Sequence, residues 1–202
     1  MSNTEEIIQS KEVLELYKEF KRFELDKGRT TLQGFTAFTK EDYDFAWFHK
    51  LVCKYLDKLE SGEIKKLMIF IPPQHGKSEL SSRRFPAKVL GNNPKAKIGL
   101  ASYSADLSNS FNRDVQNIID SDEYRKLFPN VYLNGTGIVG NELRNVNYFE
   151  TVGYKGFLKT VGVRGSLTGT PLDYGIIDDP FKDRAEANSK TIRDKVWQWY
   201  QD

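Results

Sequence analysis

Apolar residues in the first third of the chain recur every three or four positions, a spacing that predicts helices. One helix is predicted over residues 3–25 and is broken by Gly28 and the Thr30–Thr31 pair. A second is predicted over about residues 42–60 and ends at Ser61–Gly62. We therefore expect a helical extension over residues 1–62, ahead of a core domain over residues 63–202.

From residue 63 onward, short apolar runs alternate with segments of helical spacing. This alternation predicts an α/β fold, with a largely parallel central sheet flanked by helices. Gly153 and Gly156 between two apolar runs predict a β-hairpin insertion, and Ser104 suits the N-cap of a helix. Strands are expected near residues 66–71, 96–103, 148–152, 157–163 and 174–177, and helices near residues 76–90, 104–119 and 189–200.

Composition excludes some classes of protein. The 202 residues suffice for one well-packed domain, and the single Cys53 excludes an intramolecular disulfide and fits a reducing compartment. No segment resembles a signal peptide, and no apolar run approaches the ~20 residues of a membrane span. The net charge of +2 gives no indication for or against nucleic acid, so a DNA-binding face would be a local patch. We expect a cytoplasmic protein with no membrane partner.

The most informative motif follows the apolar run of residues 67–71. That run stops at Pro72–Pro73, and Gly76-Lys77-Ser78 then opens a predicted helix. The order strand, tight loop, helix turns backbone N–H groups toward a phosphate. Lys77 would reach the β- and γ-phosphates and the Ser78 hydroxyl would ligate Mg²⁺, so ATP and Mg²⁺ are the expected ligands.

The match to the usual phosphate-loop pattern is partial. The first glycine of G-x-x-x-x-G-K-[ST] falls on Ile71, and the two prolines can shape the turn but cannot donate hydrogen bonds. The expected nucleotide contacts are Pro73, Gln74, His75, Gly76, Lys77, Ser78 and Glu79.

Two acids could complete the site. Asp178 and Asp179 directly follow the apolar run of residues 174–177, and the carboxyl ends of parallel strands are where ligands bind. We assign Asp178 to the Mg²⁺ shell and Asp179 to activation of the attacking water. Taken alone, Asp179–Pro180 would be read as a turn, but its pairing with the upstream loop favours the functional interpretation.

In its motifs the chain resembles the ATPase part of a tailed-bacteriophage terminase large subunit, the motor that packages viral DNA. The resemblance implies a P-loop NTPase fold of the ASCE/RecA-like class and ATP hydrolysis that powers translocation of double-stranded DNA into a procapsid. It implies as partners double-stranded DNA, the portal protein, the small terminase subunit and other copies of the chain in a ring, in the host cell cytoplasm. The matching residues are 67–79, 101–104, 161–169, 176–180, 186–189 and 197–200.

The chain also departs from that family. Many members carry arginine at the position of Gln74, and related motors often have glutamate at that of Asp179. In that family the chain continues with a coupling motif on a further strand and then with a nuclease domain. In related motors the strand of the coupling motif lies between the strand that precedes the phosphate loop and the strand that precedes the acids. We expect the chain to end before these parts, which leaves hydrolysis by this chain alone an open question.

The resemblance further implies an arginine that acts on a neighbouring subunit's nucleotide. Arg164, in a glycine-flanked loop, is the first candidate and Arg144 the second, with a solvated surface charge as the alternative for each. Arg83 and Arg84 are expected to pack or pair. Phe48 lies where this family contacts adenine, although an aromatic stripe at helical spacing also suits a core.

Two other functions stay open at this point. One is a different P-loop ATPase acting on nucleic acid, such as a helicase-like enzyme. The other is a nucleotide-binding assembly module that binds ATP without turnover.

Overall fold

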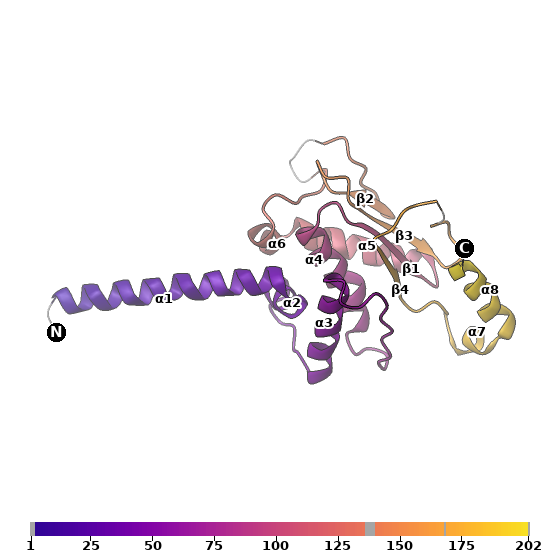
Figure 1. Ribbon diagram of the computed structural model, residues 1–202, viewed down its shortest axis with the longest axis horizontal. Coiled ribbons are helices and arrows are strands. Elements are labelled where there is room, and N and C mark those ends of the chain that lie inside the picture. Colours follow the sequence, from indigo (N-terminus) through magenta and orange to yellow (C-terminus); the bar gives the residue numbers. More distant parts are fainter. Residues whose placement is uncertain (1–2, 136–139, 168, 202) are drawn as a thin grey trace.

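A computed structural model of the chain describes residues 3–135, 140–167 and 169–201, with side chains from residue 11 onward. Its sheet has the strand order β2-β3-β1-β4 (Figure 1). Strand β1 pairs in parallel with β3 and with β4, whereas β2 and β3 form an antiparallel hairpin. The predicted mixed α/β fold with a mostly parallel sheet is thereby confirmed. The strands are β1 (Lys97–Ser102), β2 (Tyr148–Glu150), β3 (Phe157–Gly162) and β4 (Tyr174–Ile177).

Helices flank the sheet and extend beyond it at both ends of the molecule (Figure 1). Helix α1 projects from the body as a long rod, and α7 and α8 lie at the opposite end. None of the helices within the described residues combines the length and apolarity needed to cross a membrane. The helices are α1 (Asn3–Thr30), α2 (Leu32–Thr39), α3 (Trp47–Glu60), the π-helix η1 (Glu79–Arg84), α4 (Phe85–Asn92), α5 (Ala105–Asp120), α6 (Asp122–Leu127), α7 (Arg184–Asn188) and α8 (Lys190–Gln201).

One hydrophobic core joins the sheet to the helices around it. Strand β1 is buried along almost its whole length, as expected for an inner strand of a parallel sheet. Residues of α2 and α3 pack in the same core as residues of β1 and α5. The predicted boundary between a helical extension and a core domain at residue 62 stays a prediction. Among the core side chains are Leu32, Phe35, Leu56, Leu80, Phe85, Ile98, Leu100, Phe111, Phe149 and Leu158.

The strand predicted over residues 66–71 is not formed. The segment alternates as a strand does: Leu67, Ile69 and Ile71 pack against the core, while Met68 and Phe70 are 82% and 88% exposed. However, its backbone makes no hydrogen bond to any residue that the structure describes. A β-strand requires a neighbouring strand to pair with, so the segment stays extended and unpaired.

Several helix boundaries also differ from the prediction. Helix α1 continues through Gly28, and the Thr31 hydroxyl then accepts the N–H of Gly34 and starts α2, which was not predicted. Helix α3 begins at Trp47 rather than near residue 42. The helix after Gly76 contains the π-helix η1, and the short helices α6 and α7 were also missed.

Candidate functional site

The loop over residues 72–78 curls around a hollow. Gln74 (φ 63°) and Gly76 (φ 73°) both adopt left-handed backbone conformations, and the helical turn begins at Lys77. Such turns direct successive N–H groups into a concavity that suits an anion. The loop lines a cavity of about 350 Å³, together with Ile71, Glu79, Arg83 and Asp179.

Gly76 sits where no side chain fits. A Cβ atom there would lie 2.6 Å from the hydroxyl of Tyr43 and 2.9 Å from Nε2 of His49. The positive φ of Gly76 independently favours glycine. The glycine therefore allows the loop to pack directly against the segment that leads into α3.

His49 holds the loop from the first turn of α3. Its Nδ1 accepts the backbone N–H of Ala46 at 3.2 Å, so the proton resides on Nε2. That Nε2–H donates to the carbonyl oxygen of His75 at 3.1 Å. Nothing in the sequence pattern indicates this contact, because it depends on tertiary packing.

Lys77 meets both predicted acids. Its Nζ lies 3.1 Å from Oδ1 of Asp178 and forms a second ion pair with Asp179. Desolvation lowers the pKa of Lys77, but hydrogen bonds and attraction from Asp179 and Asp178 outweigh it and raise the pKa above its ordinary value. The loop and the end of β4, far apart in the sequence, thus converge on one cationic group.

The two acids have different surroundings. Asp178 is 3% exposed, and its Oδ2 accepts a hydrogen bond from the hydroxyl of Ser82 at 2.7 Å. Asp179 is exposed and has a left-handed backbone (φ 46°), which strains a non-glycine residue. Asp178 is therefore fixed in place, while the Asp179 carboxylate faces the cavity that it lines.

Mg²⁺ prefers hard oxygen ligands, and the sequence predicts that Ser78 and Asp178 supply them. The Ser78 hydroxyl makes no hydrogen bond that caps the helix after the loop. Ser78 lines the cavity, whereas the buried Asp178 does not line it and instead contacts Lys77, which does. These are the two residues predicted to hold the cation.

Glu79 also lines the cavity, and cationic side chains surround its carboxylate. Its carboxylate accepts from Nε of Arg84 at 2.8 Å and lies 3.1 Å from Nζ of Lys40. Burial raises the pKa of Glu79, but hydrogen bonds and attraction from Arg84 and Lys40 lower it by more. The pKa of Glu79 therefore lies below its ordinary value. Nucleotide contact by Glu79 stays a prediction.

Aromatic rings flank the loop on the α3 side. The ring of Phe48 is 4.2 Å from that of His49 and 5.8 Å from that of His75, between centroids. His75 also contacts the carbonyl oxygen of Pro73 through Nδ1, at 2.7 Å. Phe48 is thus adjacent to the loop, and its contact with adenine stays a prediction.

The two candidate trans-acting arginines differ in availability. Arg164 is exposed on the turn after β3, in a left-handed conformation (φ 73°), and forms no ion pair with any residue in the described part of the chain. The indole N–H of Trp199 donates to the carbonyl oxygen of the next residue, Gly165, at 2.8 Å and ties this turn to α8.

Arg144 is instead fully engaged within the chain. Its guanidinium pairs with Asp120 and donates to Oε1 of Gln116 and to the carbonyl oxygen of Asn134, each at 2.9 Å. These bonds hold the segment before β2 against α5. The geometry favours Arg164 over Arg144 as the arginine free to act outside its own chain.

Arg83 and Arg84 pair as predicted. Nε of Arg84 donates to Glu79, and Nε of Arg83 donates to Oδ2 of Asp114 at 2.6 Å.

A comparison with known proteins identifies the family. The sequence model described as terminase large subunit, T4likevirus-type, N-terminal, matches residues 68–202. No curated protein and no solved structure matches the chain. The family match covers more than half of the chain and includes both Lys77 and the Asp178–Asp179 pair, so the chain belongs to the T4-like terminase large subunits and corresponds to their N-terminal region.

Proposed function

We propose that this chain is an ATP-hydrolysing motor domain with a phosphate loop at residues 72–78, which powers translocation of double-stranded DNA into a procapsid. The observation that carries the proposal is the placement of the Lys77 ammonium between the carboxylates of Asp178 and Asp179, beside a loop built around Gly76. Membership in the terminase large subunit family supports it.

The residues of the loop fit a nucleoside triphosphate with Mg²⁺. The backbone N–H groups of Gln74 to Ser78 would cradle phosphate oxygens, and Lys77 would exchange its carboxylate partners for the β- and γ-phosphates. Ser78 and Asp178 would hold the cation, which when bound neutralises charge on the phosphates. Asp179, exposed at the cavity, would accept a proton from the attacking water.

A neighbouring copy would complete the site. The guanidinium of Arg164, uncommitted within the described part of its own chain, is suited to stabilise charge on the transferred phosphoryl group from the next subunit of a ring. Double-stranded DNA would be bound through its phosphates without regard to sequence, so binding would weaken with salt. The portal and the small terminase subunit are the proposed partners in the host cytoplasm.

Steady-state phosphate release with Mg²⁺ and ATP, in the presence of DNA and portal, tests the proposal. We expect turnover by the wild-type chain and a reduction of roughly 10²–10⁴-fold in Asp179→Asn, the magnitude typical of a lost general base. Lys77→Ala should be similarly inactive, whereas the exposed Lys66→Ala should match wild type.

The outcome also separates the alternative functions. Equal release by wild type and Lys77→Ala under all conditions would refute catalysis by this chain and leave a nucleotide-binding assembly module. Stimulation by DNA that is indifferent to portal would instead favour a helicase-like ATPase.

A further inference from the structure

A second cationic side chain, Arg83, lines the same cavity as Lys77. It belongs to the π-helix η1, one turn beyond the loop. Its guanidinium lies 4.6 Å from the ring centroid of Phe111, and its Nε donates to Oδ2 of Asp114 at 2.6 Å, both residues of α5. Arg83 therefore connects the cavity to α5.

Arg83 and Arg84 differ in how many of their guanidinium N–H groups form hydrogen bonds within the described part of the chain. Arg84 is almost buried and uses Nε and Nη1 in three hydrogen bonds, to Glu79 and to the carbonyl and hydroxyl oxygens of Thr39. Arg83 uses only Nε in a hydrogen bond, with the carboxylate of Glu79 at 3.9 Å as a further, longer ionic contact. Its two terminal NH₂ groups donate to no described residue, and 24% of the side chain is exposed.

The helix that carries Ser82 and Arg83 is a π-helix at this point. The N–H of Phe85 donates to the carbonyl oxygen of Leu80, five residues earlier, so this turn is wider than an α-helical one. π-turns inside α-helices occur frequently at functional sites. Here Ser82 reaches the buried Asp178 while the next side chain, Arg83, reaches the cavity.

We propose that Arg83 binds the terminal phosphate of the nucleotide within its own chain, an inference that rests on the proposed function. Guanidinium groups present a planar fork of N–H donors that matches phosphate oxygens. Asp114 and Phe111 hold the group by Nε and by its face, which leaves the fork of terminal donors available. Because the loop has Gln74 and no arginine of its own, Arg83 supplies the second cation, beside Lys77, that a triphosphate attracts.

The consequence is discrimination between triphosphate and diphosphate. A group that contacts only the terminal phosphate strengthens binding of ATP and leaves binding of ADP unchanged. The test is equilibrium titration of wild type and Arg83→Gln with ADP and with a non-hydrolysable ATP analogue, both with Mg²⁺. We expect Arg83→Gln to bind the analogue roughly 10- to 100-fold more weakly, the usual effect of a lost charge-assisted hydrogen bond, with ADP affinity unchanged.

Arg113→Gln is the matched control, since Arg113 is an exposed arginine of α5 beside Asp114. Arg83→Lys, which keeps the charge but loses the fork, should give a preference for the analogue between those of wild type and Arg83→Gln. Thermal unfolding checks that each variant is folded; should Arg83→Gln fail to fold, Arg83→Lys decides the question.

The inference is overturned if the ratio of the two affinities is unchanged in the folded variant, whether both affinities are intact or both are equally weakened. If wild type nevertheless binds the nucleotides more tightly than Lys77→Ala does, the proposed function stands. If wild type binds neither nucleotide, or Lys77→Ala binds both as well as wild type does, the proposed function and the inference are overturned together.

Discussion

Left-handed backbone conformations concentrate at the candidate site. Four non-glycine residues in the described part of the chain have positive φ: Gln74 lies in the loop, Asp179 follows β4, and Arg164 occupies the turn proposed to face a neighbouring subunit. The fourth, Lys155, lies in the β2–β3 hairpin. Such residues cost about 1–3 kcal/mol each and persist where the surrounding structure holds them, commonly at ligand sites. This pattern supports the site independently of its charges.

Gly76→Ala tests the packing of the loop. A methyl group would collide with the Tyr43 hydroxyl and His49 Nε2, so we expect nucleotide affinity to fall by at least roughly tenfold and stability by about 1–3 kcal/mol. Gly62→Ala is the control, because Gly62 has a similar positive φ (78°) but no atom within 4 Å of the new carbon. Denaturant unfolding and ATP titration of both variants provide the measurement. Identical behaviour of the two variants would show that the contact with Tyr43 and His49 is unimportant.

The pKa of Glu79 gives a pH dependence. Because the folded state holds this pKa below its ordinary value of 4.5, the stabilisation is present above pH 4.5 and is lost as the pH falls through the folded pKa. We expect Glu79→Gln to be less stable than wild type at neutral pH, and the difference to shrink steadily below pH 4.5. Denaturant unfolding across this range measures it. A difference that does not change with pH would mean that the charge of Glu79 adds nothing.

At the scale of elements, the helices and strands that could be predicted are those with a clear local pattern of apolar residues or caps in the sequence. Strands β1, β3 and β4 are short apolar runs, and α5 begins at the predicted cap Ser104, whose hydroxyl accepts the N–H of Leu107. Helices α2, α6 and α7 span 8, 6 and 5 residues, too few turns for apolar periodicity to stand out. The π-helix has no sequence signature that we could use.

The same distinction applies to the site. The proximity of Lys77 to Asp178 and Asp179 could be predicted from residue order, because the carboxyl ends of parallel strands meet at one edge of a sheet, while the roles of these residues stay predictions. The bond from Ser82 to Asp178 and the contact of His49 with the loop depend on how separate elements pack, so they could not be predicted.

The unpaired segment of residues 66–71 shows why a strand pattern alone does not make a strand. Leu67, Ile69 and Ile71 pack against the core as a strand pattern predicts, but the backbone of the segment forms no hydrogen bond with any described strand. We expect Ile69→Ser, on the inner face, to cost about 1–3 kcal/mol, and Phe70→Ser, on the exposed face, to stay within about 0.5 kcal/mol of wild type. Denaturant unfolding distinguishes the two. If Phe70→Ser were the more destabilising change, the orientation described here would be wrong.

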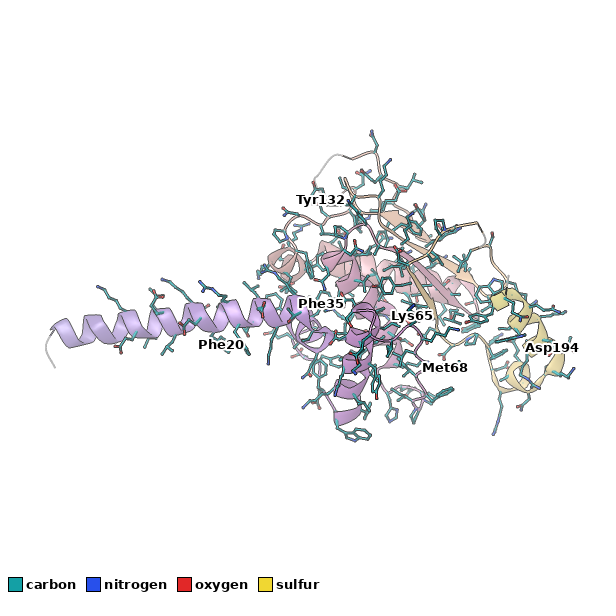
Figure 2. The ribbon with its side chains drawn as sticks, in the orientation of Figure 1. Phe20, Phe35, Lys65, Met68, Tyr132 and Asp194 are labelled. Atoms are coloured by element: carbon teal, nitrogen blue, oxygen red, sulfur yellow. The ribbon has the colours of Figure 1, made fainter. Side chains whose placement is uncertain are left out.

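At the scale of the whole molecule, α1 stands apart from the compact body (Figure 2). Phe20, labelled on the projecting rod, is 56% exposed, whereas Phe35 of α2 is fully buried. Among the described side chains of α1, from residue 11 onward, those at its C-terminal end attach it to the body: Leu25 packs against the core, and the Arg29 guanidinium donates to the carbonyl oxygen of Leu127 at 2.8 Å. Of the described part of α1, only this C-terminal end should therefore contribute to the stability of the body.

Two truncations test that attachment. Removing residues 1–22 should leave the free energy of unfolding within about 0.5 kcal/mol of wild type, because no described side chain of residues 11–22 packs against the core. Removing residues 1–30 should cost about 1–3 kcal/mol, because it also removes Leu25 and the hydrogen bonds of Arg29. Equal destabilisation by the two truncations would contradict this description of α1.

The central claim is that the Lys77 loop and the acids after β4 form one binding site for Mg²⁺ and a nucleoside triphosphate. The most direct measurement is equilibrium titration of ATP, with and without Mg²⁺, into wild type and Lys77→Ala, with thermal unfolding to confirm that both are folded. The account predicts Mg²⁺-dependent binding by wild type and an affinity at least roughly tenfold lower in Lys77→Ala. Equal ATP affinities in the two folded proteins would contradict it.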